Sequence, residues 1–414
     1  MTRSLIGVTL LVPAMVIAEP WAFDEPLPVA GDGETPHFHH LDGAGRRHVA
    51  VSGNDVGVVW EDDSSGAPQV YIATKPRDQD HFGAPRQIST GAEAYEPAIV
   101  GLGDGRFATA WEQDQSVVAR IVGAVDAGAL QVLAGPGARQ ITLAGDGDGR
   151  LVAVWAHNGG HGQLIEAAGL SIEGAGVRAA LQAVAVAPLT EHAYQGYPAA
   201  AFNHRGDLLI AWEDRRAGHT RLFHTRRAAG QAFAAERQLN EHNAPPPGEE
   251  GAGLGSGVMR VMLAVDGADR ARAVWLDKRN AASGYAVWGA ASEDAGGTFG
   301  TNEIVQDDNG SAVAQWHAAL TAGGRMFVAA WDDAREGWED NSETGDVLLS
   351  WNDGGGWSAD WLVPVASGAG YQGSPALTLD KRGDLHLVWI ERDDLTSPTR
   401  LRYAHGRAVT SAVP

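Results

Sequence analysis

Hydrophobic and polar positions along this chain form short apolar runs of strand length that recur in one order. Each unit has an apolar run, a Gly/Asp turn, a second apolar run ending in tryptophan, a polar loop, and two further short runs. The runs lack the 3.6-residue period of an amphipathic helix. Turns such as GDGR at 103–106 supply the positive φ angles that a tight hairpin requires. The pattern predicts four short antiparallel strands per unit.

One tryptophan marks each unit, at spacings of 44 to 63 residues: Trp60, Trp111, Trp155, Trp212, Trp275, Trp331 and Trp389. Residues 194–216 align without gaps with residues 371–393, 177 positions later, which is the length of three units of 59. A four-stranded unit cannot bury both of its faces alone, whereas radial packing against neighbours buries them. We therefore predict an all-β fold, a β-propeller of seven four-stranded blades, forming a single domain over residues 19–414.

A ring of blades must be closed by pairing the two ends of the domain. The segment EPLPVAG at 25–31 resembles LVPVASG at 362–368, so we expect the N-terminal strand to complete the last blade beside RLRYAHG at 400–406. The alternative gives that place to the C-terminal segment RAVTSA.

Two turns share the pattern S-x-[DN]-x-G-x-x-[FW]: SEDAGGTF at 292–299 and SWNDGGGW at 350–357. A short acid can accept backbone N–H groups across such a turn, glycine tolerates a left-handed conformation, and the terminal aromatic ring can cover the blade edge. Degenerate copies end at Phe82 and Phe233, keeping the ring and losing the acid. We therefore expect a structural role for these residues: Ser292, Asp294, Gly296 and Phe299, with Ser350, Asn352, Gly354 and Trp357.

Three loops after the marker tryptophans read W-x-D-x-R: WEDRR at 212, WLDKR at 275 and WDDAR at 331. The repetition favours a structural Asp–Arg ion pair that orders each loop, since one substrate cannot contact every copy equally.

The paired turns, the W-x-D-x-R loops and the recurring x-P-A start of the first strand resemble the sialidase, or BNR-repeat (Asp-box), superfamily of β-propellers. That resemblance covers nearly the whole domain and implies a β-propeller fold. Propellers of this superfamily usually have six blades, so six blades are the alternative to the predicted seven. A sialidase would need an arginine in an R-I-P motif on the first blade, where this chain reads ETPHFHHLDG. No catalytic residue is therefore transferred from the resemblance, and the catalytic residues are left unassigned.

The amino-acid composition and the N-terminal segment exclude several classes of partner and chemistry. The chain has 31 basic and 52 acidic residues, a formal net charge of -21, so nucleic acid and anionic membranes are unfavourable partners. An arginine, an apolar run and small residues before Glu19 predict a signal peptide over residues 1–18, and hence a secreted or periplasmic protein that is not inserted in a membrane after cleavage. The chain has no cysteine, which excludes disulfides and thiolate chemistry. We expect a monomer without a cofactor.

In a propeller, ligands bind where the innermost strands begin, so residues at the predicted strand starts are the candidate ligand-binding set. They are aromatic rings for stacking on sugars, arginines for carboxylate or sulfate, and groups able to move protons: His37, His39, Tyr95, Arg139, Tyr197, Arg215, Arg260, His317 with the adjacent Trp316, and Tyr371. His37 and His39 lie on one face of a strand and would hold a metal only if Asp42 or His48 converged on them, so no metal site is assigned.

Two functional hypotheses follow. One is a non-catalytic binding or scaffold propeller of the cell envelope that holds a glycan or a protein partner, and the sequence favours it because no nucleophile and base pair can be named. The alternative is a glycan-active enzyme, an exo-sialidase-like hydrolase or a polysaccharide lyase acting on acidic sugars through an arginine-lined channel mouth.

Overall fold

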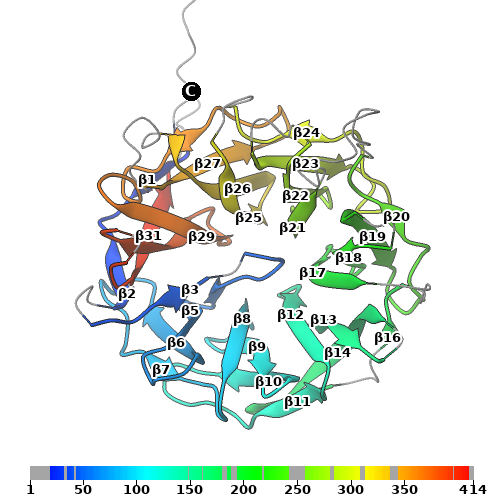
Figure 1. Ribbon diagram of the computed structural model, residues 1–414, viewed down its shortest axis with the longest axis horizontal. Helices are drawn as coiled ribbons and strands as arrows, with labels where there is room; N and C mark the ends of the chain where they lie inside the picture. The colour runs from blue at the N-terminus through cyan, green and yellow to red at the C-terminus, as the bar shows by residue number, and fades with distance from the viewer. Residues whose placement is uncertain are drawn as a thin grey trace, which may run out of the picture.

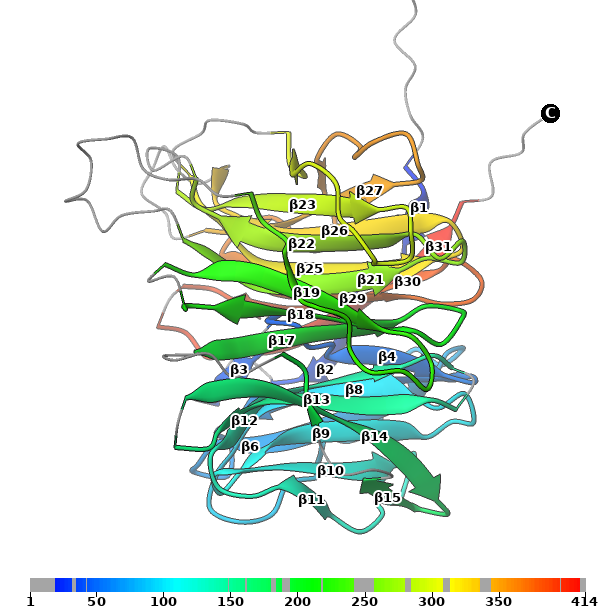
Figure 2. The same cartoon turned by 90° about the vertical axis from the view of Figure 1, so that its right-hand side faces the viewer.

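The computed structural model describes residues 19–31, 35–41, 43–147, 149–160, 162–179, 184–187, 194–216, 219–241, 257–279, 284–307, 313–335, 344–394 and 396–409. These residues form seven antiparallel sheets arranged in a ring (Figure 1), with no α-helix among them. The inner strands run along the ring axis from one face to the other (Figure 2). The expected signal peptide, residues 1–18, lies outside the described part of the chain, as does Asp42.

Six of the sheets, or blades, follow one another in chain order. In blade 1 the inner strand is split into β3 (His39–His40) and β4 (Val49–Ser52), both paired with β5 (Asp55–Asp62), and β6 (Gln69–Pro76) and β7 (Arg86–Gln87) follow. Blade 2 holds β8 (Ala94–Gly101), β9 (Phe107–Gln113), β10 (Ser116–Val122) and β11 (Gln131–Ala134). Blade 3 holds β12 (Ala138–Gly145), β13 (Leu151–Asn158), β14 (Gln163–Glu173), β15 (Gly176–Ala179) and β16 (Val184–Ala185).

The next three blades keep the four-stranded pattern. Blade 4 holds β17 (Gln195–Phe202), β18 (Leu208–Asp214), β19 (Arg221–Arg227) and β20 (Arg237–Gln238). Blade 5 holds β21 (Val258–Val265), β22 (Ala271–Asp277), β23 (Ala286–Ser292) and β24 (Glu303–Ile304). Blade 6 holds β25 (Gln315–Gly323), β26 (Met326–Asp333), β27 (Asp346–Asn352) and β28 (Trp361–Leu362). With blade 7, the predicted seven blades are confirmed and the six-bladed alternative is wrong.

Blade 7 is built from both ends of the described chain. Its strands β29 (Tyr371–Leu379), β30 (Leu385–Arg392) and β31 (Arg400–Ala408) are completed by β1 (Trp21–Phe23) and β2 (Leu27–Ala30), which both pair with β31. The expected N-terminal closure is therefore confirmed. The competing assignment, in which the C-terminal segment closes the ring, is wrong because the N-terminal strands occupy the outer edge of β31.

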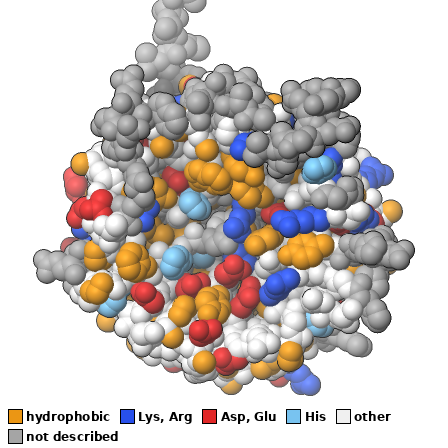
Figure 3. Space-filling view, in the orientation of Figure 1, with side chains coloured by type: hydrophobic (Ala, Val, Ile, Leu, Met, Phe, Trp, Pro, Cys, Tyr) orange, Lys and Arg blue, Asp and Glu red, His pale blue; other side chains and the backbone are white. Residues whose placement is uncertain are grey.

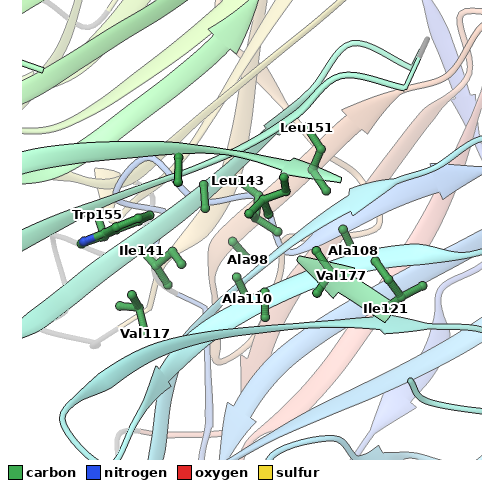
Figure 4. Packing of buried hydrophobic residues seen from close by; sticks show 14 of the residues in the cluster. Ala98, Ala108, Ala110, Val117, Ile121, Ile141, Leu143, Leu151, Trp155 and Val177 are labelled. Carbon is green, nitrogen blue, oxygen red and sulfur yellow. The ribbon is translucent and has the colours of Figure 1, made fainter. Parts of the chain in front are cut away.

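The marker tryptophans form the core between blades. All seven are 0% exposed, and each lies in an apolar cluster shared with the preceding blade. Figure 4 shows one such cluster, in which Trp155 and Ile141 of blade 3 face Ala98, Ala110 and Val117 of blade 2. Burial of a large ring at each of the seven interfaces supplies the apolar area that holds neighbouring blades together.

In five blades the residue two places after the tryptophan accepts the indole N–H; the exceptions are Trp155, which donates to Glu166 at 3.0 Å, and Trp389. Indole N–H groups donate to Asp62 at 2.6 Å, to Gln113 at 3.1 Å and to Asp277 at 3.1 Å in their own blades. In three blades the same aspartate also pairs with the arginine of the W-x-D-x-R motif at 2.6 Å: Asp214 with Arg216, Asp277 with Arg279, and Asp333 with Arg335. The expected structural ion pairs are present.

The Ser292–Phe299 turn joins the third and fourth strands of blade 5. Asp294 accepts the Thr298 N–H at 2.8 Å and the Ser292 hydroxyl at 2.8 Å. Although burial raises its pKa, these hydrogen bonds outweigh that effect and lower the pKa of Asp294 to about 2. A Cβ on Gly296 would lie 2.0 Å from Leu209 of blade 4, and Phe299 packs edge-on against His224 of the same blade. The turn therefore packs blade 5 against blade 4 and stabilises this interface.

Candidate functional site

The inner strands begin on one face of the ring, which we call the mouth face; it also carries the loops that follow the marker tryptophans. Figure 3 shows this face, with acidic side chains gathered below and to the left of the centre and basic ones mainly to the right. Six inner strands start with a break in the ladder register, and a non-glycine residue with positive φ lies at each break: Glu96, Gln140, Tyr197, Arg260, His317 and Ser374. Such bulges re-aim side chains and recur at functional sites.

Acidic side chains from the preceding blade hold several of these bulges. The carboxylate directly after the tryptophan accepts the bulge N–H of the next blade: Glu61 from Glu96 at 3.0 Å, Glu213 from Arg260 at 2.9 Å, and Asp332 from Ser374 at 3.1 Å. Glu112 accepts the N–H of Gln140 in the same way. The hydrogen bonds compensate for the strained backbone and give the mouth a fixed ring of carboxylates.

The channel behind the mouth is filled by residues 43–48, the link between β3 and β4, which reaches from blade 1 into the centre of the ring (Figure 1). A Cβ on Gly45 would lie 2.1 Å from the Pro198 carbonyl of blade 4, and the Gly45 carbonyl accepts the Thr142 hydroxyl of blade 3 at 2.6 Å. Arg46 donates to the Ile141 carbonyl at 3.1 Å. We call this segment the plug, and it forms the floor of the mouth.

On blades 6 and 7, one buried carboxylate joins a histidine and a tyrosine. Asp332, whose side chain is 6% exposed, lies 2.7 Å from Nδ1 of His317 and accepts the Tyr371 hydroxyl at 3.2 Å. An ionised carboxylate only accepts hydrogen bonds, so Nδ1 of His317 is the donor, and in the neutral imidazole Nε2 then carries the lone pair. Burial and then the charge of Asp332 raise the pKa of Tyr371 well above its ordinary value, so Tyr371 stays protonated.

A cavity of about 180 Å³ adjoins this histidine. Its walls include His317, Arg260 of blade 5, Trp316 and Gly43 of the plug. The Trp316 side chain is 40% exposed, and its ring lies 5.1 Å from that of Tyr285. The Arg260 guanidinium lies 4.7 Å from the centre of the Tyr197 ring. A histidine, a cation and a partly exposed indole thus share one cavity.

The opposite side of the mouth is acidic. Glu61, Glu96 and Glu112 converge there, and Glu96 pairs with the buried Arg46 of the plug. Burial and then the charge of Glu96 raise the pKa of Glu112 to about 7, and burial raises that of Glu61. Glu112 therefore favours its protonated form beside Glu96.

A second cavity of about 270 Å³ lies beside Glu112, with Arg139 and Asn158 in its walls. Arg139 donates to the side-chain oxygen of Gln163 at 2.9 Å. The largest cavity described, about 610 Å³, lies on the other face between blades 7 and 1, where Asp24, Arg77 and His405 are among its walls. Its acidic and basic groups are largely paired with each other, as in the contact of Arg407 with Asp24 at 2.9 Å.

Of the residues expected at the mouth from the sequence, the structure brings Arg260, His317 and Tyr371 together, with Tyr197 beside Arg260. Arg215 lies at the rim, 5.2 Å from the centre of the Tyr194 ring. Tyr95 lies in the acidic half, where a hydrogen bond with Glu93 and then burial raise its pKa to about 12.

His39 is not at the mouth surface. It is 4% exposed and lies against Thr399, with Nδ1 2.8 Å from the hydroxyl. His37 is half-buried, and its carbonyl accepts the N–H of Thr399 at 3.0 Å. His48, one of the two further ligands considered for a metal, lies with Nδ1 3.2 Å from the Val59 carbonyl. Within the described ranges, no three His, Asp or Glu side chains converge as a metal would require.

The sequence reasoning missed Asp332, Glu61, Glu96, Glu112 and the plug. These carboxylates directly follow a marker tryptophan or, for Glu96, lie at a bulge, so their position relative to the repeat is the signal that identifies them. Aligning the units on tryptophan places Glu61, Glu112, Glu213 and Asp332 in one column.

Comparison with known proteins shows that this chain resembles solved structures in fold. No family model and no curated protein sequence matches the chain. Among solved structures, the polysaccharide lyase Uly1 is similar with a TM-score of 0.58 and 9% identity, covering 95% of this chain and 98% of the lyase. The propeller domain of the Trilobed protease from Pyrococcus furiosus, described as having an open velcro topology, is similar with a TM-score of 0.50 and 10% identity over 89% of this chain and 93% of that domain.

An α-L-arabinanase from Penicillium chrysogenum is similar with a TM-score of 0.48 and 9% identity, covering 92% of this chain and 98% of the arabinanase. The resemblance to the sialidase superfamily is not supported by a family match. None of the described segments is a helix long and apolar enough to cross a membrane. The comparisons establish the propeller fold.

Proposed function

We propose that this protein is a glycan-active propeller that cleaves uronic-acid-containing polysaccharides by β-elimination, as a polysaccharide lyase. The observation that carries the proposal is the 2.7 Å contact between Nδ1 of His317 and the buried Asp332, in a cavity shared with Arg260. A base, a carboxylate-binding cation and a sugar-stacking indole are the groups that this reaction needs. The similarity in fold to a polysaccharide lyase is compatible with this assignment and does not carry it.

The chemistry follows from the geometry. Arg260 binds the uronate carboxylate and stabilises the negative charge that develops on it when the neighbouring carbon loses its proton. Nε2 of His317 takes that proton, and Asp332 stabilises the imidazolium that forms. The bond from the adjacent carbon to the glycosidic oxygen then breaks, leaving a double bond conjugated with the carboxylate. The leaving oxygen takes a proton from solvent.

The acidic half of the mouth fits glycoside hydrolysis less well. A glycosidase holds two carboxyls about 5 Å or more apart on either side of the scissile bond. Here Glu112 favours its protonated form beside Glu96, and Glu96 is itself paired with the buried Arg46. The expectation of a non-catalytic scaffold has no support from the similar structures, whereas the contact of His317, already a candidate from the sequence, with the buried Asp332 supports a base at this cavity.

The proposed activity agrees with the expected export of the protein, because acidic polysaccharides are found outside the cell. We therefore propose that the protein is secreted or periplasmic, as the expected signal peptide at residues 1–18 implies.

The test is a screen of uronate polymers for the ultraviolet absorbance of the conjugated product, run beside an assay for new reducing ends. We expect both signals to rise together with one polymer, and His317→Ala to lower the rate by about 100-fold or more. Arg260→Ala should lower it similarly. His81→Ala, an exposed histidine on the other face, is the matched control and should keep full activity. Reducing ends without absorbance would show hydrolysis and overturn the proposal, as would a fully active His317→Ala variant.

A further inference from the structure

Basic side chains lie over aromatic rings at the mouth on blades 4, 5 and 7. Arg260 lies 4.7 Å from the centre of the Tyr197 ring, and Arg392 lies 4.6 Å from that of Tyr371. Two more pairs lie on the rim, Arg215 with Tyr194 at 5.2 Å and Lys278 with Tyr285 at 5.7 Å. We propose that these four pairs form one extended track that binds several consecutive anionic sugars of a polysaccharide. The inference rests on the proposed function for the ligand class and adds the length and placement of the bound chain.

Arg215 and Lys278 differ from the basic residues next to them in the same loops, and the difference suits them to binding a ligand. Arg216 and Arg279, one residue further on, are bound by the aspartates of the W-x-D-x-R motif at 2.6 Å. Within the described residues, Arg215 and Lys278 form no ion pair, although the chain carries an excess of 21 negative charges. Each cation is held over a ring, which orients it and leaves its hydrogen-bonding capacity for an anion.

The pairs are joined into a continuous path. The Arg215 N–H donates to the Tyr194 carbonyl at 3.0 Å, and Tyr197 of the same blade contacts Arg260. Tyr285 lies 5.1 Å from Trp316, which shares its cavity with Arg260 and His317. The track thus passes the proposed catalytic histidine and continues to Tyr371, which shares Asp332 with that histidine. Flat rings beside cations suit a chain of pyranose rings with anionic substituents.

The same structural positions carry the opposite charge on the other side of the ring. The residue three places after the marker tryptophan is Arg215, Lys278 and Arg392 in blades 4, 5 and 7, but Asp63 and Asp114 in blades 1 and 2. Glu61, Glu96 and Glu112 lie in that acidic half as well. Like charges repel an anionic chain there, so the chain lies over blades 4 to 7.

Calorimetric binding to defined uronate oligosaccharides tests the track, using His317→Ala as the background so that the ligand is not consumed. We expect a hexasaccharide to bind more tightly than a disaccharide. Arg215→Ala and Lys278→Ala should each weaken hexasaccharide binding about tenfold and change disaccharide binding less than about twofold. Arg205→Ala and Lys381→Ala, exposed residues on the opposite face, are matched controls and should change neither. Unchanged melting temperatures verify folding.

The outcomes separate the two proposals. If Arg215→Ala and Lys278→Ala (the rim variants) bind the hexasaccharide as tightly as the His317→Ala protein that carries neither change, the proposed track is wrong, even when the wild type shows elimination. If no oligosaccharide binds, the track is overturned as well. If the rim variants weaken hexasaccharide binding while the wild type produces no absorbance signal, the track stands and the lyase proposal fails. A higher salt concentration should weaken binding of the hexasaccharide more than binding of the disaccharide, because it screens more ionic contacts in the longer ligand.

Discussion

The fully buried carboxylate of Asp214 lies 2.6 Å from Nη2 of Arg216. The same carboxylate accepts the N–H of the Trp212 indole at 3.4 Å, so one ion pair orders both a core ring and a mouth loop. We expect Arg216→Ala to lower the free energy of unfolding by about 3 kcal/mol, because it leaves Asp214 buried without its cation. Chemical denaturation of the variant measures the loss.

Arg205→Ala is the control for this prediction, because it removes an exposed arginine of the same blade, which pairs at the surface with Asp269 of blade 5. It should change stability by less than about 1 kcal/mol. Equal losses in the two variants would show that the buried pair has no special role.

The plug requires glycine at position 45. Gly45 has φ of 75°, and a Cβ there would lie 2.1 Å from the Pro198 carbonyl. Gly66 has φ of 91°, and a Cβ there would have no heavy atom within 4 Å. Gly66→Ala should therefore cost about 1–2 kcal/mol from backbone strain alone, whereas Gly45→Ala should cost several kcal/mol more or prevent folding. Thermal unfolding of both variants separates the cost of backbone strain from the cost of a steric clash with Pro198. Equal melting temperatures would contradict a tightly packed plug.

Stability should depend on pH through Glu112. Its pKa is raised by burial and then by Glu96, from 4.5 to about 7, so the folded state favours the protonated form. Its contribution to stability is complete below about pH 4.5 and is lost as the pH rises through about 7. Glu112→Gln should gain about 2 kcal/mol relative to the wild type across this window, because glutamine keeps an acceptor for the Gln140 N–H. Melting temperatures between pH 4 and pH 8, roughly, measure the gain, and parallel curves would contradict the assignment.

Ring closure depends on Trp21. Its ring is buried, lies 6.1 Å from that of Trp351, and donates its N–H to the Gly383 carbonyl at 2.8 Å. Trp21→Ala should cost about 3–5 kcal/mol by leaving a cavity at the closure. Trp316→Ala removes an equally large ring from the mouth, where it is partly exposed, and should leave the melting temperature nearly unchanged while weakening oligosaccharide binding. A reversed order of melting temperatures would contradict this account of closure.

The architecture could be predicted from the sequence because its determinants are local and repeated. A Gly/Asp turn, an apolar run and a tryptophan suffice to form one blade, and seven copies leave few other ways to bury seven indole rings. The closure by residues 25–31 was also predictable, because a similar segment precedes the last blade.

The site could be predicted only in part. Arg260, His317 and Tyr371 were found because they begin inner strands, but Asp332, which links the last two, comes from the end of a second strand. The bulges add a residue to each inner strand and so change which side chains face the mouth. The plug depends on contacts of Gly45 with blades that lie far away in the sequence, and no repeat unit predicts it.

The pairing of β1 with β31 places Asp24 beside Arg407, 383 positions apart in the chain. Contacts of such long sequence separation carry a large loop-closure entropy and form slowly. Blades 1 to 6 can assemble from neighbouring segments as the chain is made, whereas the seventh must wait for the final strand. We therefore expect capture of the N-terminal strands to come late in folding, and a chain that lacks them would expose the outer edge of β31 as an open template for another chain.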